Sequence, residues 1–478
     1  MAQNPANRHN RIVQREALER EVSVANEKFT EIQQQLLKLK ASLNKTSLIM
    51  AYLPLEVLAE IFTLVVETRK PLFNVDKVVP PSFILGSVSR AWRKVVWSMP
   101  RLWTVVSITI SSKKHEIQRE LLEDWVERSA SLGLHIYLQS YWPTPSTVYE
   151  PLLAVSGRWE SFYASGKFKS LCSRLEDSQY RFDRMSSLQI SFASDSILWR
   201  FSGADRLKTL KIDYGPTLDL LEVSLSHVEH MDAYLDPSNW VFGLERMPSL
   251  RTCKLRLASD REHTRPHPPA KLTTFQRLVA LLISIDGDLS ERTAVAQVLD
   301  VVTAPRLDSL DIRLEYIEQD WIPQFFNMPK RSACQLTTLL IDNSGNNFAE
   351  ADLVKLLRLL PSLKTFAMRQ GVIISDKTIN VLNPSLSKHA SLPNLTSLEF
   401  NGKITFNLQS MLSMVRERLR ASNQAPASFQ RLETFRIQYS NISWGRKKDP
   451  NDLQAFYTQL VSLKQLGTKL DIVWVDDD

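Results

Sequence analysis

Residues 307–312 read Leu-Asp-Ser-Leu-Asp-Ile, and the same pattern, L-x-x-L-x-I, recurs along the chain from residue 185 onward. Well-formed copies start at Leu207, Leu250, Leu278, Leu307, Leu336, Leu363, Leu395 and Leu432, and weaker copies start at Met185 and Val228. The mean period of about 27 residues is that of a solenoid, in which each repeat stacks only on its neighbours. Because apolar and outward residues alternate at the end of each copy, each copy predicts a short strand, and the stacked strands predict a parallel sheet.

The segments between the copies often have the spacing of an amphipathic helix. In residues 347–360, Asn347 can cap the helix, Glu350 follows three residues later, and the predicted buried face consists of Leu353, Leu356, Leu357 and Leu360. The pattern resembles strand-plus-helix leucine-rich repeats, although the asparagine expected after the third apolar position is mostly missing. The resemblance implies an α+β or α/β solenoid over residues 185–478, with a curved parallel sheet, outer helices and a C-terminal cap. Residues 111–184 are then expected to form a linking or capping region.

The outward residues of such a sheet form one extended surface. In the two outward positions that end each copy, basic residues outnumber acidic ones, and the basic ones are the candidate substrate-binding residues: Lys211, Lys254, Arg256, Arg313, Arg369 and Arg436. Their charge favours an acidic or phosphorylated partner. For any one of these side chains, the alternative is an ordinary solvated surface residue.

A different periodicity occupies residues 1–50. Its apolar positions are separated by alternating steps of four and three residues: Leu18, Val22, Ala25, Phe29, Ile32, Leu36, Leu39 and Leu43. This repeat of 3.5 residues predicts a long helix with one apolar stripe, because the intervening residues are mostly polar. A single helix of this length is marginal in water, so the stripe must be covered. Two coverings remain open: self-association as a coiled coil, and packing against the rest of the same chain.

Residues 51–110 contain two shorter amphipathic patterns. The first begins with Pro54 at a first-turn position, where proline is tolerated, and its predicted apolar face consists of Leu58, Ile61, Phe62 and Val65. The second pattern has its apolar face at Leu85, Val88, Trp92 and Val95. A module of about 50 residues buries little surface by itself, so part of its apolar area is expected to face a neighbouring domain or a partner chain.

These patterns resemble the F-box motif. The matching positions are Leu53-Pro54, Ile61-Phe62, Val88-Ser89-Arg90, Trp92-Arg93 and Pro100 to Trp103. The resemblance implies docking onto a Skp-type adaptor of a cullin–RING ubiquitin ligase, and it implies adaptor contacts at Leu53, Pro54, Ile61, Phe62, Leu85, Val88 and Trp92. With a long predicted helix in residues 1–50 before this motif, the sequence also resembles the large F-box families of mushroom-forming fungi.

The module departs from the F-box pattern at two places. The connection from about Glu67 to Ser82 is longer than the compact connection of the family, and this is the departure that would weaken docking. Ser89 stands where the family often has cysteine, which exchanges one small side chain for another. The alternative is that both apolar faces belong to the core of a helical domain.

The composition and motifs argue against catalysis. Only 13 of the 478 residues are glycine, and the chain lacks the Gly-rich phosphate loops, the GxSxG elbow and the HExxH motif, so no enzyme activity and no cofactor are expected. His227 and His230, like His263 and His267, have no third ligand at a suitable spacing, so no metal site is expected. The three cysteines are far apart, and we find no apolar segment of signal-peptide or membrane-spanning type. We therefore expect free thiols and a cytoplasmic or nuclear location, or both.

The order of the modules leads to a functional hypothesis. A docking motif followed by a long interaction surface indicates the substrate-recognition subunit of a cullin–RING ubiquitin ligase of the SCF type, which binds a protein substrate through its repeats. The alternative is a non-catalytic scaffold or nucleic-acid-associated repeat protein that self-associates through residues 1–50. The net charge of +7 is spread along the chain, which argues against nucleic acid as the partner.

Overall fold

The computed structural model describes residues 5–45, 53–68, 80–111, 113–177, 179–191, 197–213, 218–235, 240–258, 272–286, 294–314, 321–343, 348–386, 392–426, 428–440 and 469–475. The chain divides into two compact units. Unit 1 comprises Met1–Ser107 and Glu120–Leu134, and unit 2 comprises Ile108–Arg119 and His135–Asp478. The division therefore passes through three elements: β1 (Val105–Ile110), α6 (His115–Arg128) and β2 (Leu134–Ser140).

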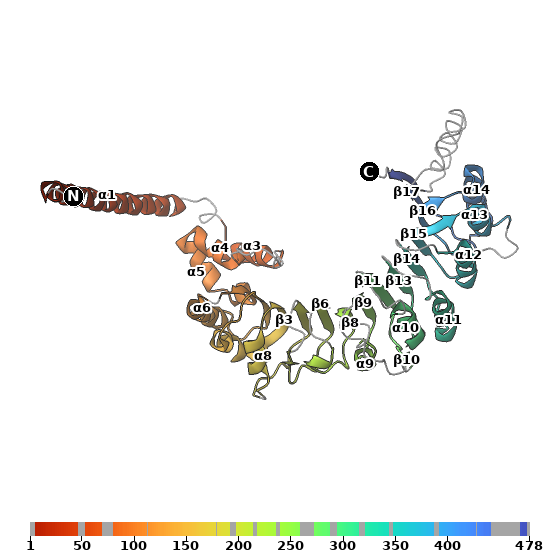
Figure 1. Ribbon diagram of the computed structural model, residues 1–478, viewed down its shortest axis with the longest axis horizontal. Helices are drawn as coiled ribbons and strands as arrows, with labels where there is room; N and C mark the ends of the chain where they lie inside the picture. The colour runs from red at the N-terminus through yellow and green to blue at the C-terminus, as the bar shows by residue number, and fades with distance from the viewer. Residues whose placement is uncertain are drawn as a thin grey trace, which may run out of the picture. The chain divides into compact units, whose positions relative to one another are not determined.

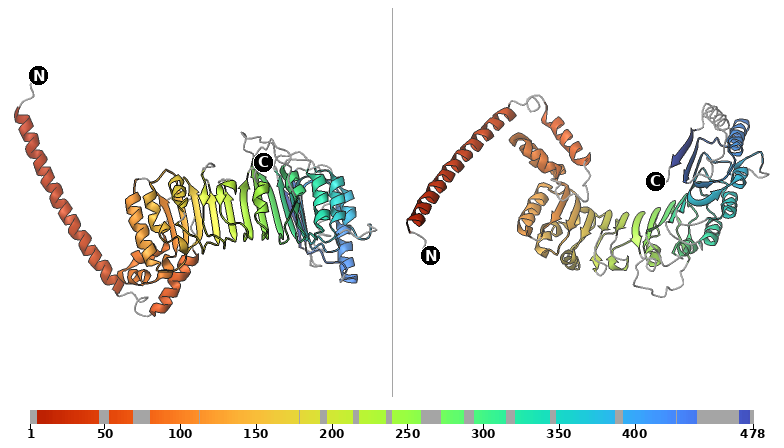
Figure 2. Two further views of the ribbon diagram at one scale, coloured as in Figure 1. Left: turned by 90° about the horizontal axis from the view of Figure 1, so that it is seen from below. Right: turned by 45° about the horizontal axis from the view of Figure 1, so that its top comes forward.

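Unit 1 is helical before β1. Its elements are α1 (Pro5–Lys45), α3 (Leu55–Thr68), α4 (Pro81–Val88), α5 (Arg90–Trp97) and the 3-10 turn η1 (Pro100–Trp103). Figure 2 draws α1 as one unbroken helix, as the heptad pattern predicts. The second pattern of residues 51–110 is not one helix, because Ser89 has extended backbone and its Oγ accepts a hydrogen bond from the backbone N of Trp92 at 3.1 Å. That capping bond starts α5 as a separate helix.

Aromatic side chains form the core of unit 1. The ring of Phe83 meets the rings of Trp103 and Trp125 edge to face, with centroids 5.2 Å apart in each case. Both tryptophans are almost fully buried, and Trp103 Nε1 donates a hydrogen bond to the carbonyl of Val96 at 2.9 Å. Because a buried indole N–H needs a partner, this bond fixes η1 against the end of α5.

Unit 2 is built on one long sheet. The strand order is β1-β2-β3-β4-β6-β8-β9-β11-β13-β14-β15-β16-β17-β18, and from β3 onward each neighbouring pair is parallel. The strand bounds are β3 (Trp159–Gly166), β4 (Ser187–Ser191), β6 (Thr209–Asp213), β8 (His230–Leu235), β9 (Thr252–Ala258), β11 (Ala280–Asp286), β13 (Ser309–Leu314), β14 (Thr338–Asn343), β15 (Thr365–Ile374), β16 (Ser397–Ile404), β17 (Thr434–Ser440) and β18 (Lys469–Val475). Two small parallel pairs, β5 (Trp199–Arg200) with β7 (Leu221–Glu222) and β10 (Thr273–Thr274) with β12 (Val302–Thr303), lie outside this sheet.

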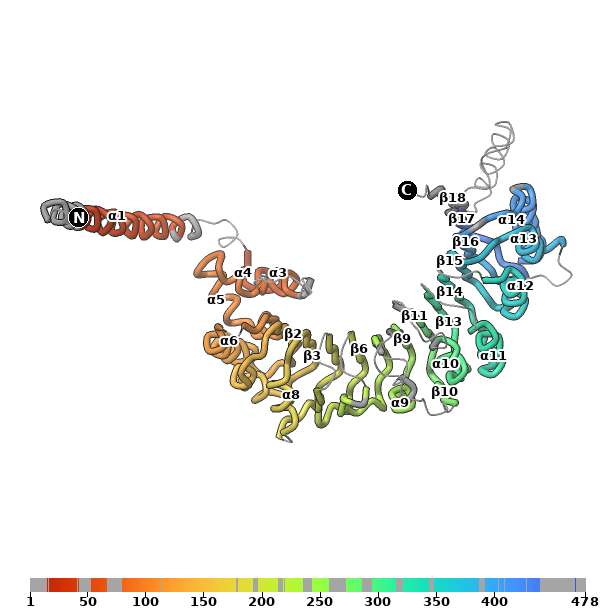
Figure 3. Tube along the Cα trace, in the orientation of Figure 1, coloured from red at the N-terminus to blue at the C-terminus, as the bar shows by residue number. Residues whose placement is uncertain are grey.

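Helices cover one face of this sheet. They are α7 (Glu150–Leu153), α8 (Lys169–Leu175), α9 (Trp240–Glu245), α10 (Ala294–Val301), α11 (Ile322–Ser332), α12 (Glu350–Leu359), α13 (Asp376–Leu382) and α14 (Leu408–Gln424), with short 3-10 turns at Ser146–Tyr149, Ser156–Arg158 and Leu218–Leu220. Within unit 2 the strands line the inner side of a curve and the helices its outer side (Figures 1 and 3). In the part of the chain that the structure describes, no helix lies on the other face of the sheet, which we call the helix-free face.

Equivalent positions of the L-x-x-L-x-I pattern lie beside one another in the sheet. Leu310 of β13 is in register with Leu281 of β11 and Leu339 of β14, and all three side chains are buried. The outward residues Leu282 and Leu340, one position further along, are only half-buried. The predicted α/β fold with a long parallel sheet and an N-terminal helix is therefore confirmed.

The sheet extends beyond the residues predicted to form it. β1, β2 and β3 precede residue 185, so part of the region expected to link or cap the array belongs to the sheet. In β3, Phe162 pairs with Leu188 and Ala164 pairs with Ile190. An aromatic and a small side chain thus fill buried positions that the pattern assigns to leucine and isoleucine.

The helix predicted over residues 347–360 is shorter than expected. α12 begins at Glu350, its N-cap residue is Ala349, and no side chain caps it; Asn347 lies outside the described residues. The predicted buried face is confirmed, because Leu353, Leu356, Leu357 and Leu360 are all buried.

The composition predicts free cysteine thiols and no membrane-spanning segment. Cys172 and Cys253 are buried and Cys334 is half-buried, and all three are free thiols. Burial raises the pKa of both buried thiols, so neither forms a thiolate near neutral pH. Among the helices of the described residues, none combines the length and the apolar character needed to cross a membrane.

Candidate docking surfaces

α3 has two apolar faces, of which one is covered. Its residues Leu58, Phe62 and Val66 are buried in unit 1. Val57, Ile61 and Leu64 follow the same helical spacing about a third of a turn away, and they are 44%, 41% and 52% exposed. Because a run of large exposed apolar side chains on one helix face is characteristic of an interaction site, this second face is a candidate docking surface.

The seven residues predicted to contact an adaptor divide between the surface and the core. Pro54, Ile61 and Val88 are exposed, and Leu53 and Trp92 are half-buried. Phe62 and Leu85 are buried. Phe62 is fully covered, and its ring lies 4.7 Å from that of Trp92 on α5. Phe62 and Leu85 therefore belong to the core of unit 1 and offer no exposed side chain here, so a contact of these two residues with an adaptor stays a prediction.

α4 and α5 add exposed apolar residues that the motif did not identify. Ile84 is 42% exposed and Trp97 is 48% exposed. The guanidinium groups of Arg93 and Arg128 lie over the Trp97 ring, 5.6 Å and 5.1 Å from its centroid. This arrangement keeps the orientation of a half-exposed tryptophan fixed. We define the docking face of unit 1 by its exposed apolar residues: Val57, Ile61, Leu64, Ile84, Val88 and Trp97.

On the helix-free face of the sheet, the predicted substrate-binding residue Arg256 forms ion pairs with two aspartates. Its Nη1 lies 2.8 Å from Oδ1 of Asp213, and its Nε donates to Oδ1 of Asp232 at 3.1 Å. Burial lowers the pKa of Arg256, but the two carboxylates outweigh it and the net pKa is raised. Lys254 also points its Nζ at Asp232, 3.7 Å from Oδ2. The positive charge that the sequence suggested here is therefore largely compensated.

A second ionic cluster lies further along the same face. Arg313 donates hydrogen bonds to both carboxylate oxygens of Asp311, and Arg369 donates to Oε1 of Glu399 at 2.9 Å. These bonds raise the pKa of both guanidinium groups. Burial raises the pKa of Asp342 between them, and the two arginines only partly counter that rise. Arg313 and Asp311 lie on the same strand, β13, whereas Arg369 and Glu399 pair across the adjacent strands β15 and β16.

The two remaining predicted residues occupy different surroundings. Lys211 is half-buried on β6 and Arg436 is exposed on β17. The six basic residues therefore do not form one cationic patch, since β11, between the two ionic clusters, contributes the half-buried Leu282, and β14, within the second cluster, contributes the half-buried Leu340. Asp232 was not predictable as a partner of these cations, because its copy of the pattern, which starts at Val228, is weak. The aspartate falls in the same outward column as Lys211 and Lys254.

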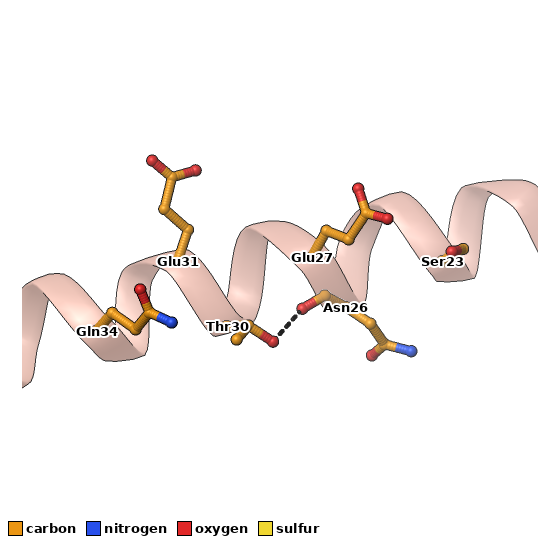
Figure 4. Close-up of a pocket in the computed structure, with 6 residues that line it drawn as sticks. All are labelled: Ser23, Asn26, Glu27, Thr30, Glu31 and Gln34. Carbon is orange, nitrogen blue, oxygen red and sulfur yellow. Dashed lines mark hydrogen bonds between the residues drawn. The ribbon is translucent and has the colours of Figure 1, made fainter.

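α1 presents a third surface. The close-up in Figure 4 shows six polar side chains along this helix that line a shallow, open surface feature: Ser23, Asn26, Glu27, Thr30, Glu31 and Gln34. All six side chains come from the same helix, so the feature is an open helix surface and not an enclosed ligand site. It lies beside the apolar stripe, whose described members are all exposed.

Neither a metal site in the described residues nor a known relative identifies the function of these surfaces. Among the described residues, no three His, Cys, Asp or Glu side chains gather in a way that would hold a metal ion. His230 instead shares a hydrogen bond of 2.7 Å with Thr252, and His263 and His267 lie outside the described residues. The chain matches no protein-family model and no curated protein.

Proposed function

We propose that this protein is the substrate-recognition subunit of a cullin–RING ubiquitin ligase, without catalytic activity of its own. In this proposal the F-box-like segment docks onto a Skp-type adaptor, and the strand-and-helix array, as leucine-rich repeats, holds a protein substrate. The observation that carries the proposal is the second apolar face of α3, which is exposed while the first face forms the core. An F-box must satisfy both demands, since it needs its own core and an apolar surface for the adaptor.

The docking face of unit 1 has the chemistry of a helix-to-helix interface. Its six apolar residues lie on three short helices, of which α3 and α5 pack through the rings of Phe62 and Trp92, while Leu85 of α4 is buried. Transfer of several exposed aliphatic side chains from water into an interface is favourable by about 25 cal/mol per Å² of apolar area. The buried residues keep the helices in place, so substitutions at exposed positions test docking without removing the core.

The test is co-purification of the full-length chain with the adaptor. The double variant Ile61→Glu with Val88→Glu places two charges in the docking face, and we expect it to lose the adaptor. Leu386→Glu is the matched control, because Leu386 is an exposed leucine of unit 2, 63% accessible, and its substitution is expected to leave binding intact. Circular dichroism of all variants verifies folding. Retention of the adaptor by the folded double variant would refute the proposal.

The proposed substrate surface is the helix-free face of the sheet. Its paired charges favour a partner with both acidic and basic groups, and the half-buried Leu282 and Leu340, on either side of Asp311 in the sheet, add apolar contacts. This amends the expectation of an acidic or phosphorylated partner, since most of the predicted cations already have carboxylate partners. A salt titration separates nucleic-acid binding from the proposed adaptor docking, because phosphate-backbone binding weakens steeply with salt and apolar helix-to-helix docking does not.

A further inference from the structure

The apolar stripe of α1 is a surface that the proposed ligase function does not use. Its residues repeat every 3.5 positions, and those with described side chains are between 49% and 64% exposed: Leu18, Val22, Phe29, Ile32, Leu36 and Leu39. Ala25, in the same stripe, is also exposed. A stripe of this period sustained over more than three heptads is the signature of a coiled coil, in which a second helix covers the seam.

We propose that α1 pairs with α1 of a second copy of this chain as an antiparallel coiled coil, centred between Thr30 and Glu31. The pairing places Val22 opposite Leu39 of the second copy. By the two-fold symmetry, Ala25 then lies opposite Leu36, and Phe29 lies opposite Ile32. Apolar positions meet in every one of these layers, because the alternating spacing of four and three residues reads the same from both ends.

The sizes of the side chains select this orientation over the parallel one. In a parallel pair each residue faces its own copy, so Ala25 meets Ala25 and leaves a gap, whereas Phe29 meets Phe29 and crowds the seam. In the antiparallel pair the small Ala25 faces the larger Leu36, and Phe29 faces the smaller Ile32. Cores are packed to nearly uniform density, and both gaps and overpacking are destabilising.

The charges beside the seam select the same orientation. The antiparallel register brings Glu19 of one copy next to Lys40 of the other, twice by symmetry. In the parallel register the flanking positions that face each other are Glu21 with Asn26, Lys28 with Gln33 and Gln35 with Lys40, none of which are oppositely charged. Glu19 already accepts a hydrogen bond from Arg15 on its own helix through Oε1, which leaves its second oxygen for the lysine.

This association is independent of the proposed function. It joins two copies of the chain through residues outside the docking face of unit 1 and outside the sheet. A dimer of this kind would present two substrate surfaces together, so a partner with two binding segments would be held more tightly than by one copy.

Disulfide crosslinking of the full-length chain tests the orientation. One preparation carries Ala25→Cys and the other Leu36→Cys, and each is oxidised alone and after mixing. We expect a crosslinked dimer only in the mixture, because two copies of residue 25 lie roughly 16 Å apart along an antiparallel pair, beyond the reach of a disulfide. The wild-type chain, with its three native cysteines, is the control. Crosslinking of Ala25→Cys with itself would establish a parallel pair, and no crosslinking in the mixture would exclude the pairing; either result overturns the proposal.

A charge exchange provides the second test. Glu19→Lys puts lysine against lysine in its own dimer, and Lys40→Glu puts glutamate against glutamate, whereas a mixture of the two restores both ion pairs. We expect each variant alone to dimerise roughly fivefold more weakly than the mixture, as measured by analytical ultracentrifugation. Glu27→Lys, on the side of α1 away from the seam, is the matched control. Equal association of the two single variants and their mixture would contradict the register.

Discussion

Nη1 of Arg256 lies 2.8 Å from Oδ1 of Asp213, although their strands, β9 and β6, are not neighbours in the sheet. β8 runs between them and contributes Asp232, whose Oδ1 accepts a hydrogen bond from Nε of the same guanidinium at 3.1 Å. One side chain thus ties three successive strands on the helix-free face. The Arg256 side chain is only 18% exposed, so these interactions are partly shielded from solvent.

Replacement of Arg256 by methionine is expected to destabilise unit 2. The change leaves Asp213 and Asp232 as neighbouring carboxylates without their shared cation, and a loss of about 1–2 kcal/mol lies between the values for exposed and buried ion pairs. Urea unfolding followed by circular dichroism measures it. Lys254→Met is the matched control: its ion pair with Asp232 is longer, at 3.7 Å, and we expect a change below about 0.5 kcal/mol. Equal effects of the two substitutions would contradict the assigned role of Arg256.

The apolar columns of the sheet could be predicted from the sequence because each column combines period-two alternation with a fixed repeat length. The same reasoning missed β3, where Trp159, Phe162 and Ala164 occupy the buried positions. An aromatic side chain buries as much area as leucine or more, so packing accepts it while a pattern built on leucine does not. It also missed β18, although Leu470 and Ile472 align with Phe435 and Ile437 of β17. In that copy a glycine, Gly467, stands at the first leucine position.

The candidate docking surface was predictable only in part. The spacing of α3 predicts its helix, but both Ile61 and Phe62 are apolar, and the sequence does not determine which of them faces the core. The structure resolves this through the ring contact between Phe62 and Trp92. The ionic clusters were not predictable for a different reason, since the pairing of Arg369 with Glu399 joins residues 30 positions apart and depends on the register of β15 and β16.

Ser89 is expected to stabilise unit 1 through its cap. Ser89→Ala removes the side-chain acceptor for the backbone N of Trp92, and loss of such an N-cap bond destabilises by about 1 kcal/mol. Ser87→Ala is the control, because the Ser87 hydroxyl bonds only to the carbonyl of Ile84 within its own helix, where little change is expected. Hydrogen exchange at the backbone amides of α5 measures the effect locally. Unchanged protection of these amides in Ser89→Ala would show that the cap is dispensable.

Glu350 is expected to make the stability of unit 2 depend on pH. Burial raises the pKa of its carboxyl, but hydrogen bonds from the backbone and hydroxyl groups of Ser375 and Thr378 outweigh it, so the net pKa lies below the ordinary 4.5. A lowered pKa in the folded state means that the stabilisation is present above about pH 4.5 and is lost as the pH falls through the folded-state value. Glu350→Gln should therefore cost about 1–3 kcal/mol at pH 7 and progressively less in acid.

The measurement for Glu350 is the urea midpoint of both proteins as a function of pH. Asp352→Asn serves as the control, since this carboxylate lies in the same first turn of α12 and pairs only with Lys355, an exposed side chain. Its substitution should change stability by less than about 1 kcal/mol. A difference between wild type and Glu350→Gln that stays constant from neutral to acidic pH would contradict the proposed linkage.

Arg418 holds the C-terminal helices of unit 2 together. Its side chain is fully buried in α14, its Nη1 donates to the carbonyl of Leu382 at 3.1 Å, and its Nη2 donates to the carbonyl of Leu392 at 2.7 Å. Leu382 is the last residue of α13, whose final carbonyls have no partner within the helix. Burial lowers the pKa of this guanidinium to about 10, so at neutral pH it remains charged and both bonds are charge-assisted.

Arg418→Met is therefore expected to destabilise unit 2 by about 2–4 kcal/mol, because it fills the same space but leaves two buried carbonyls without a donor. Arg418→Lys keeps the charge but not the planar fork that reaches both carbonyls, so it should recover only part of the loss. Arg420→Met, at an exposed position of the same helix, should change stability by less than about 0.5 kcal/mol. The urea midpoints of the three variants measure these differences in stability. If Arg418→Met were as stable as Arg420→Met, the buried guanidinium would contribute no net stability, because the cost of its desolvation would cancel the gain from its hydrogen bonds.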